Sequence, residues 1–161
     1  MARTVLVAVH LESPAYWAIS YAIQLAARLR SSVVLMVVTR SSLWSDKREP
    51  AQIYLAGLKD DQRLWLDQAV ARCQREGVNM EIFFSCGPFF QEVIRFVQVQ
   101  SSVDFIVMGL PSDSPKRKRD AFPASIMRLH DQFAGEILLV QEREGVTQLA
   151  KRYPHNAGKG N

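Results

Sequence analysis

The sequence predicts an α/β fold in which a five-stranded parallel sheet lies between two layers of helices, a three-layer doubly wound sandwich. Short apolar runs rich in β-branched residues alternate along the chain with longer segments of helical periodicity. Because a helix stands between each strand and the next, the connections cross over the sheet and the strands run parallel.

The first strand is expected at Thr4–His10, where the run TVLVAVH is typical of a strand buried on both faces. Ser13 then provides a helix N-cap and Pro14 the first helical position, so a helix should follow over residues 15–29. Its apolar residues recur at helical spacing. The run SVVLMVVT at Ser32–Thr39 predicts the second buried strand.

The middle of the chain predicts a long helix and a third strand. After a polar connection over residues 40–50, a helix is expected over residues 51–76, with Gly77 as its stop signal. The third strand follows at residues 79–85, and Gly87-Pro88 ends it and begins another helix. The buried faces of the two helices are expected to carry Leu58, Trp65, Ala69 and Cys73 in the first, and Phe90, Val93, Ile94 and Val97 in the second.

The last part of the sheet is predicted from two further runs. Residues 103–109 (VDFIVMG) form the fourth strand, residues 123–133 a helix, and Glu136–Gln141 (EILLVQ) the last strand. Beyond this strand the sequence has no periodicity. We therefore expect one domain over residues 1–143 and a polar, flexible C-terminal tail over residues 144–161.

Composition limits the classes of function. The 161 residues are 48% hydrophobic and 22% charged, as in ordinary globular proteins. Cys73 and Cys86 form no CxxC pattern, and the N-terminus has no secretory pattern. No apolar stretch approaches the roughly 20 residues needed to cross a bilayer. The sequence thus predicts a cytoplasmic protein without a membrane partner.

The carboxyl ends of the strands are the expected place for a ligand, because parallel sheets bind ligands at that edge. The fourth strand ends on Gly109, and the first ends on His10. His10 has two interpretations: a ring contact to a base or ribose, or a structural histidine bonded to a backbone carbonyl.

The loop after Gly109 contains the basic run 116–119 (KRKR) in a chain of net charge +4. This run would close over an anionic ligand, touch nucleic acid, or lie in solvent as an ordinary polar loop. Without interleaved aromatic residues, nucleic-acid binding is the weakest of these. Ser112 and Ser114 beside it are candidates for phosphorylation.

Signatures of enzymes and metal sites are absent from the sequence. It has no Walker-type loop, no dinucleotide fingerprint and no nucleophile elbow. Glu12, Asp46 and Asp104 form no evident acid–base pair, and no histidine or cysteine has a partner at zinc spacing. We therefore expect no catalytic residue and no metal.

Over residues 4–141 the sequence resembles the universal stress protein family through the order and spacing of several short stretches. These are residues 5–9 (VLVAV), 22–26 (AIQLA), 34–38 (VLMVV), 76–78 (EGV), 87–88 (GP) with Ile94, 104–109 (DFIVMG) and 137–140 (ILLV). The resemblance implies a five-stranded parallel sheet in the order 3-2-1-4-5, of the adenine-nucleotide-hydrolase-like type, and a dimer through the last strand.

The ATP-binding branch of that family has a glycine motif after strand four, and this chain departs from it. Gly109 fits the first glycine, but Ser112 and Phe122 take the places of the second and third, and Pro123 that of the Ser/Thr. Glycines there let backbone N–H groups approach phosphate oxygens. His10 also replaces an aspartate that many members have. The motif is degenerate, and we expect no bound ATP.

The resemblance implies a non-enzymatic, cytoplasmic stress-response or regulatory module. A homodimer is expected through an exposed apolar edge strand formed by Ile137, Leu138, Leu139 and Val140, because unpaired edges find partners. Two alternatives stay open: an ATP- or adenylate-binding member with at most slow hydrolysis, and a partner-binding sensor domain associated with a transporter or kinase. The nucleotide or anion pocket of the first alternative would consist of His10, Val38, Met108, Gly109, Ser112, Lys116 and Ser125.

Overall fold

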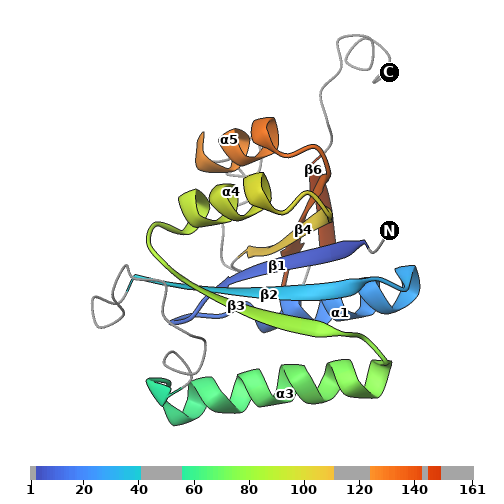
Figure 1. The fold of residues 1–161 in the computed structure, drawn as a ribbon, viewed down its shortest axis with the longest axis vertical. Helices are drawn as coiled ribbons and strands as arrows, with labels where there is room; N and C mark the ends of the chain where they lie inside the picture. Colours follow the sequence, from blue (N-terminus) through green and yellow to red (C-terminus); the bar gives the residue numbers. More distant parts are fainter. Residues whose placement is uncertain (1–2, 41–55, 111–123, 143–144, 150–161) are drawn as a thin grey trace.

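The computed structural model describes residues 3–40, 56–110, 124–142 and 145–149 and shows one sheet with helices on both faces (Figure 1). The strands lie in the order β3-β2-β1-β4-β5-β6. They are β1 (Thr4–His10), β2 (Ser32–Thr39), β3 (Met80–Cys86), β4 (Val103–Leu110), β5 (Glu136–Gln141) and β6 (Gly145–Leu149). The helices are α1 (Tyr16–Leu29), α3 (Asp60–Glu76), α4 (Phe89–Val99) and α5 (Ala124–Gln132).

The first five strands run parallel in the order 3-2-1-4-5, which confirms the fold predicted from the sequence. β1 is central and pairs with β2 on one side and β4 on the other. Its side chains are completely buried from Val5 to Val7 and nearly so at Ala8 and Val9. A strand covered on both faces needs apolar residues at every position, which explains its lack of alternation.

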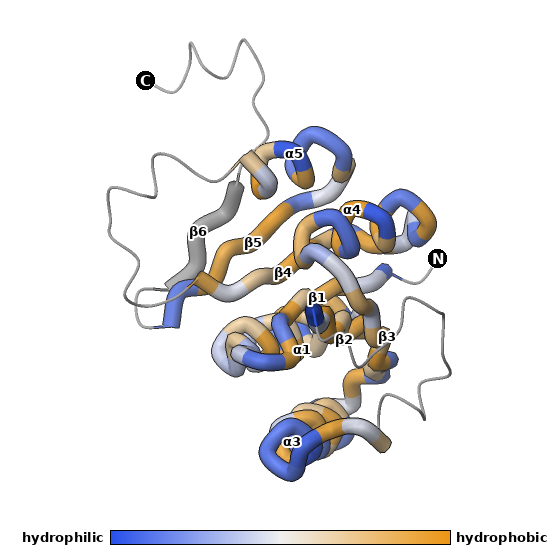
Figure 2. Tube along the Cα trace, turned by 90° about the vertical axis from the view of Figure 1, so that its left-hand side faces the viewer, coloured by the Kyte–Doolittle hydropathy of each residue, from blue (hydrophilic) through white to orange (hydrophobic). Residues whose placement is uncertain are grey.

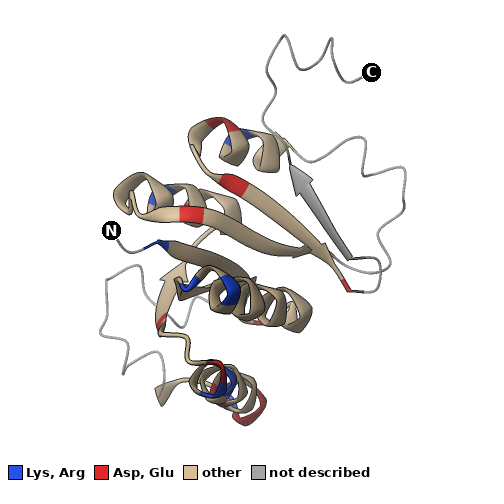
Figure 3. Ribbon diagram, turned by 90° about the vertical axis from the view of Figure 1, so that its right-hand side faces the viewer, with Lys and Arg blue, Asp and Glu red and all other residues tan. Residues whose placement is uncertain are grey.

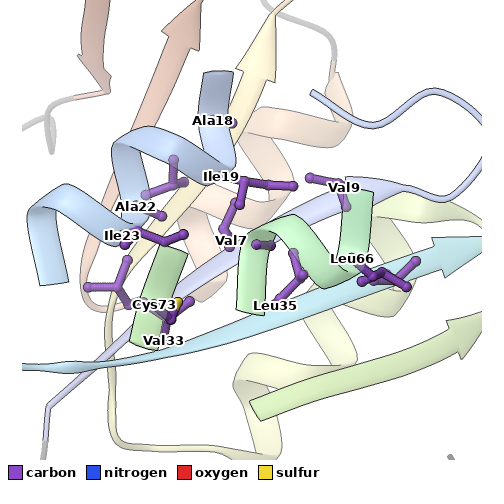
Figure 4. Packing of buried hydrophobic residues seen from close by; sticks show 14 of the residues in the cluster. Val7, Val9, Ala18, Ile19, Ala22, Ile23, Val33, Leu35, Leu66 and Cys73 are labelled. Carbon is purple, nitrogen blue, oxygen red and sulfur yellow. The ribbon is translucent and has the colours of Figure 1, made fainter. Parts of the chain in front are cut away.

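The helices form two layers (Figure 2). Val5, Val7 and Val9 of β1 belong to the core that α1 and α3 cover, and Figure 4 shows part of this packing. Leu6 and Ala8, which point the other way, belong to the core under α4 and α5. Each fully buried Val or Leu side chain contributes about 1.5–3 kcal/mol to folding, so the alternating faces of β1 stabilise both layers.

The predicted N-cap of the first helix and the continuity of the predicted long helix are wrong. α1 begins at Tyr16 with Ala15 as its N-cap, rather than at the Ser13-Pro14 signal. α3 begins only at Asp60, where the Lys59 N–H donates to Oε1 of Gln62 at 3.0 Å. Residues 51–55 of the predicted long helix lie outside the described residues. The predicted stop at Gly77 is confirmed, with a φ of 71° that favours glycine.

The N-terminal end of α1 is tied to β5 by one side-chain hydrogen bond. Trp17 of α1 donates from Nε1 to the carbonyl oxygen of Val140 in β5 at 2.8 Å, across 123 positions of sequence. The indole N–H and the carbonyl lie in a partly buried position and satisfy each other through this bond. The bond fixes α1 against the carboxyl ends of the parallel strands, where the sequence predicts a ligand.

β6 corrects the prediction that β5 is an exposed edge strand. β6 pairs antiparallel with β5, with Leu138 opposite Gln148 and Val140 opposite Val146. Ile137, Leu138, Leu139 and Val140 are buried, each at most 7% exposed. The segment predicted to be a flexible tail therefore supplies a sixth strand, which stands between β5 and any partner.

Candidate ligand-binding edge of the sheet

The carboxyl ends of β1, β2 and β4 bring several of the predicted site residues to one edge. His10 and Val38 are register partners on β1 and β2, and Ala8 pairs with Met108 on β4. Of these side chains only His10 is exposed, because Val38 and Met108 are buried under α4 and α5. Val38 instead presents its carbonyl, which accepts a bond from the N–H of Leu11 at 2.9 Å.

The His10 ring stacks on Phe89, the first residue of α4. The ring centroids are 4.1 Å apart and the planes differ by 21°. Phe89 in turn meets Phe90 edge-on at 5.1 Å. Within the described part of the chain, this ring contact, rather than a bond to a backbone carbonyl, fixes His10. One face of the imidazole is therefore already covered by the protein.

The pKa of His10 is lowered from its ordinary value of 6.5. Burial is the largest cause, because it disfavours the imidazolium; Arg40 lowers the pKa further and Glu12 opposes the shift. The neutral imidazole is thus the form favoured by the folded protein. A neutral ring can stack and accept a hydrogen bond, but it offers no positive charge to a phosphate.

A carboxylate lies at the same edge. The hydroxyl of Thr39, at the end of β2, donates to Oε2 of Glu12, just beyond β1. The carbonyl of Thr39 accepts the N–H of Gly87 at 2.9 Å and so joins the end of β2 to the β3–α4 turn. A phosphate bound here would face the like charge of Glu12, which opposes its binding.

Gly109 has a packing partner of its own. A Cβ added at Gly109 would lie 2.2 Å from Cβ of Ala15 and 3.1 Å from Nε1 of Trp17. Real Cβ atoms do not approach this closely, so the start of α1 needs a glycine at this place. The glycine that matched the nucleotide motif is therefore required by the packing of α1.

The remaining predicted site residues are not tested by these contacts. Ser112, Lys116 and the basic run 116–119, with Ser114, Phe122 and Pro123, lie outside the described residues. Ser125 is the second residue of α5 and is half-buried. Their part in a ligand pocket stays a prediction.

Sequence reasoning missed a buried carboxylate beside this edge. Glu92 on the first turn of α4 is 7% exposed, and its Oε1 accepts the hydroxyl of Ser85 from β3. Its Oε2 lies 3.3 Å from Nη1 of Arg95. Gly87 leaves room for it, since a Cβ there would stand 2.7 Å from Oε2. An acidic residue just inside a helix start, favoured there by the helix dipole, was the available signal.

Neither a metal site nor a membrane-spanning helix is found among the described residues. No group of three or more His, Cys, Asp or Glu residues there could hold a metal ion. None of the described helices is both long and apolar enough to span a membrane.

Cys73 is buried, which raises the pKa of its thiol, although Arg72 opposes this effect.

Comparison with known proteins identifies the fold. No protein-family model and no curated protein matches the sequence. Among solved structures, the chain is similar to a universal stress protein in complex with cAMP, with a TM-score of 0.59 and 17% identity over 87% of this chain and 97% of that one.

Two further universal stress proteins align almost as well. The protein from Archaeoglobus fulgidus in complex with dAMP has a TM-score of 0.54 at 15% identity, covering 85% of this chain and 96% of that one. UspA from Lactobacillus plantarum has a TM-score of 0.53 at 20% identity, covering 86% and 99%. These identities are low, so the agreement concerns the fold, and it confirms the fold that the sequence predicted.

Proposed function

Because the chain has the fold of the universal stress proteins, we propose that it belongs to that family and acts as a cytoplasmic regulatory module without enzymatic turnover. We further propose that its ligand edge does not hold ATP. The packing of Gly109 against Ala15 carries this proposal, because it explains the glycine without a nucleotide. The fold alone does not establish a function, so the choice between ATP binding and its absence depends on the residues of the edge.

The contacts of the edge support the absence of a bound triphosphate. Phe89 covers one face of His10, and the neutral form of His10 is favoured. Glu12 places a negative charge beside the ends of β1 and β2. A triphosphate is held in proteins by backbone donors, cations and metal. At the described part of this edge Arg40 acts electrostatically on His10, and Glu12 supplies an opposing negative charge.

Isothermal titration of the full chain with ATP and magnesium tests this proposal. We expect no saturable heat up to millimolar ligand, and no phosphate release above the rate of the buffer. Saturable binding of ATP that is weakened in a His10→Ala variant, but not in a variant at the distant exposed Glu81, would overturn it.

A second candidate function is the binding of a smaller adenine nucleotide at the same edge. It is favoured by the two similar structures that were determined in complex with cAMP and with dAMP. The pocket would use His10, Val38, Met108 and Gly109, with Ser112, Lys116 and Ser125 as the phosphate side. Titration with cAMP and dAMP distinguishes it from the first: heat with these ligands and none with ATP would favour the second candidate.

We also propose a homodimer that forms through the sheet. In the described sheet the outermost strands are β3 and β6, so a partner strand would pair with β6 rather than with β5. Sedimentation velocity at micromolar concentration should give a dimer. A monomer at that concentration would contradict this proposal and leave the proposal on ATP untouched.

A further inference from the structure

A groove separates α1 and α3 on the face of the sheet opposite α4 and α5. It has a volume of about 390 Å³, within the range of about 300–1,000 Å³ that is typical of small-molecule sites. It belongs to neither the ligand edge nor the sheet edges described above. None of the residues considered for nucleotide binding lines it.

One part of the groove is apolar. Ile19 and Ile23 line it from α1, and Ala69 lines it from α3. Figure 4 shows Ile23 close to the α3 segment that carries Cys73, with the core beneath it. Tyr16 and Trp65 complete this part, with ring centroids 6.2 Å apart in an edge-on arrangement. Tyr16 remains 53% exposed, so this part of the lining faces solvent.

The other part of the groove is basic. Arg72 and Arg75 line it, one turn apart on α3. Nη1 of the half-buried Arg72 donates to Oγ of Ser20 on α1 at 2.7 Å, which holds the guanidinium across the groove. Neither arginine forms an ion pair with a described residue, although Figure 3 shows acidic as well as basic residues along α3.

A positioned guanidinium without a carboxylate partner is suited to an anion. Arginine presents several N–H donors in a plane that matches a carboxylate, and only one of those of Arg72 is used by Ser20. The adjacent apolar surface is suited to a hydrocarbon or aromatic body. The two halves of the groove therefore complement the two ends of one amphipathic molecule.

We propose that the groove between α1 and α3 binds a small amphipathic carboxylate. The carboxylate pairs with Arg72, with Arg75 adding charge at the rim, and the apolar body lies along Ile19, Ile23 and the Tyr16–Trp65 pair. An aromatic acid and a fatty acid share this chemistry. Binding here is independent of the ligand edge, so it does not rest on the function proposed above.

The test uses the ¹⁵N-labelled full chain and three probes: 2-naphthoate, decanoate, and the uncharged 2-naphthamide. We expect one of the acids to shift the Trp65 indole N–H resonance and the Arg72 Nε–H resonance in a saturable manner. Saturable binding of 2-naphthoate would identify the ligand as an aromatic acid, and saturable binding of decanoate would identify it as a fatty acid. The amide should bind at least about tenfold more weakly than 2-naphthoate, since it lacks the charge-assisted bond.

Two arginine variants and a matched control test whether the acid binds in the groove. Arg72→Gln should weaken binding of the acid by about tenfold or more, and Arg75→Gln should weaken it by less. Arg63→Gln removes the same charge from an exposed position of α3 outside the groove and should leave the affinity unchanged. Arg75→Gln, on an exposed side chain, keeps the test valid if Arg72→Gln fails to fold.

Several results would overturn the proposal. These are equal binding of amide and acid, equal affinities of the Arg72→Gln and Arg63→Gln variants, or no saturable shift with either acid at millimolar concentration. Shifts of the same resonances on dilution without a probe would assign the groove to a second copy of the chain, and would equally overturn it.

Discussion

Gly109 at the end of β4 and Ala15 at the start of α1 are in such close contact that no side chain fits between them. A Cβ at Gly109 would stand 2.2 Å from that of Ala15, and Nε1 of Trp17 would be its next neighbour at 3.1 Å. The same helix start is anchored to β5 through Trp17. The position of α1 therefore depends on a glycine that a motif search would assign to a ligand.

We predict that Gly109→Ala lowers the free energy of unfolding by about 1–3 kcal/mol, because the added methyl group overpacks the contact with Ala15. Urea denaturation measures the change. Ala15→Gly in the same chain should recover part of the loss, since it removes the nearer of the two obstructing groups. A Gly109→Ala protein as stable as the parent would show that α1 can move away without penalty, and would contradict the packing argument.

The His10–Phe89 stack predicts a pH dependence of stability. The folded protein holds the pKa of His10 below 6.5, so between that pKa and 6.5 the unfolded chain binds more protons. The contribution of His10 to stability is therefore complete above pH 6.5 and is lost as the pH falls through the pKa of the folded state. Denaturation of the parent and of His10→Gln at pH 7.5 and pH 5 measures this difference.

A substitution at Phe89 tests the cause of the shift. Phe89→Leu uncovers part of the His10 ring, so the pKa of His10 should rise toward 6.5. Proton NMR titration reports it, with the His10 resonance assigned from its absence in His10→Gln. An unchanged pKa in Phe89→Leu would mean that the ring stack does not cause the desolvation.

The Ser85–Glu92 pair predicts a penalty for leaving a buried carboxylate oxygen without its donor. Ser85→Ala should lower the free energy of unfolding by about 1–3 kcal/mol, because Oε1 of Glu92 is then removed from water and from its hydroxyl. In a Glu92→Leu background the same substitution should have a much smaller effect. Equal effects in the two backgrounds would show that the pair is not coupled.

Removal of β6 should change how the chain associates. A chain ending at Glu142 leaves β5 unpaired on one side, so we expect a lower melting temperature and concentration-dependent association in light scattering. A chain ending at Leu149 keeps β6 and is the matched control, with both properties unchanged. If the shorter chain has the same melting temperature as the control and associates no more than it does, β6 does not protect the edge of β5 from association.

The parts of the fold that the sequence predicted best are those determined locally. The bounds of β1, β2 and β5 agree with the expected ones, because continuous β-branched and apolar runs leave few other conformations for a buried segment. The N-cap of α1 was wrong: Ser13 carries the local signal, but the cap is Ala15, which packs closely against Gly109 of β4. β6 was missed because GVTQL has little pattern of its own and becomes a strand by pairing with β5.

The candidate site was less predictable, since its decisive contacts join distant segments. The strand ends correctly placed His10 and Val38 at one edge. The stack on Phe89 depends on the direction in which α4 leaves β3, and the obstruction at Gly109 depends on the depth to which α1 packs. Neither quantity can be read from residue types along the chain.

The bond from Trp17 to Val140 has a consequence during synthesis of the protein. The first helix obtains its acceptor only from the last parallel strand, 123 positions later. At about 5–20 residues per second, ribosomes need on the order of ten seconds to make the intervening chain. During that time β1, β2 and α1 are synthesised without the carbonyl acceptor of Trp17, so this bond can form only after β5 has been made.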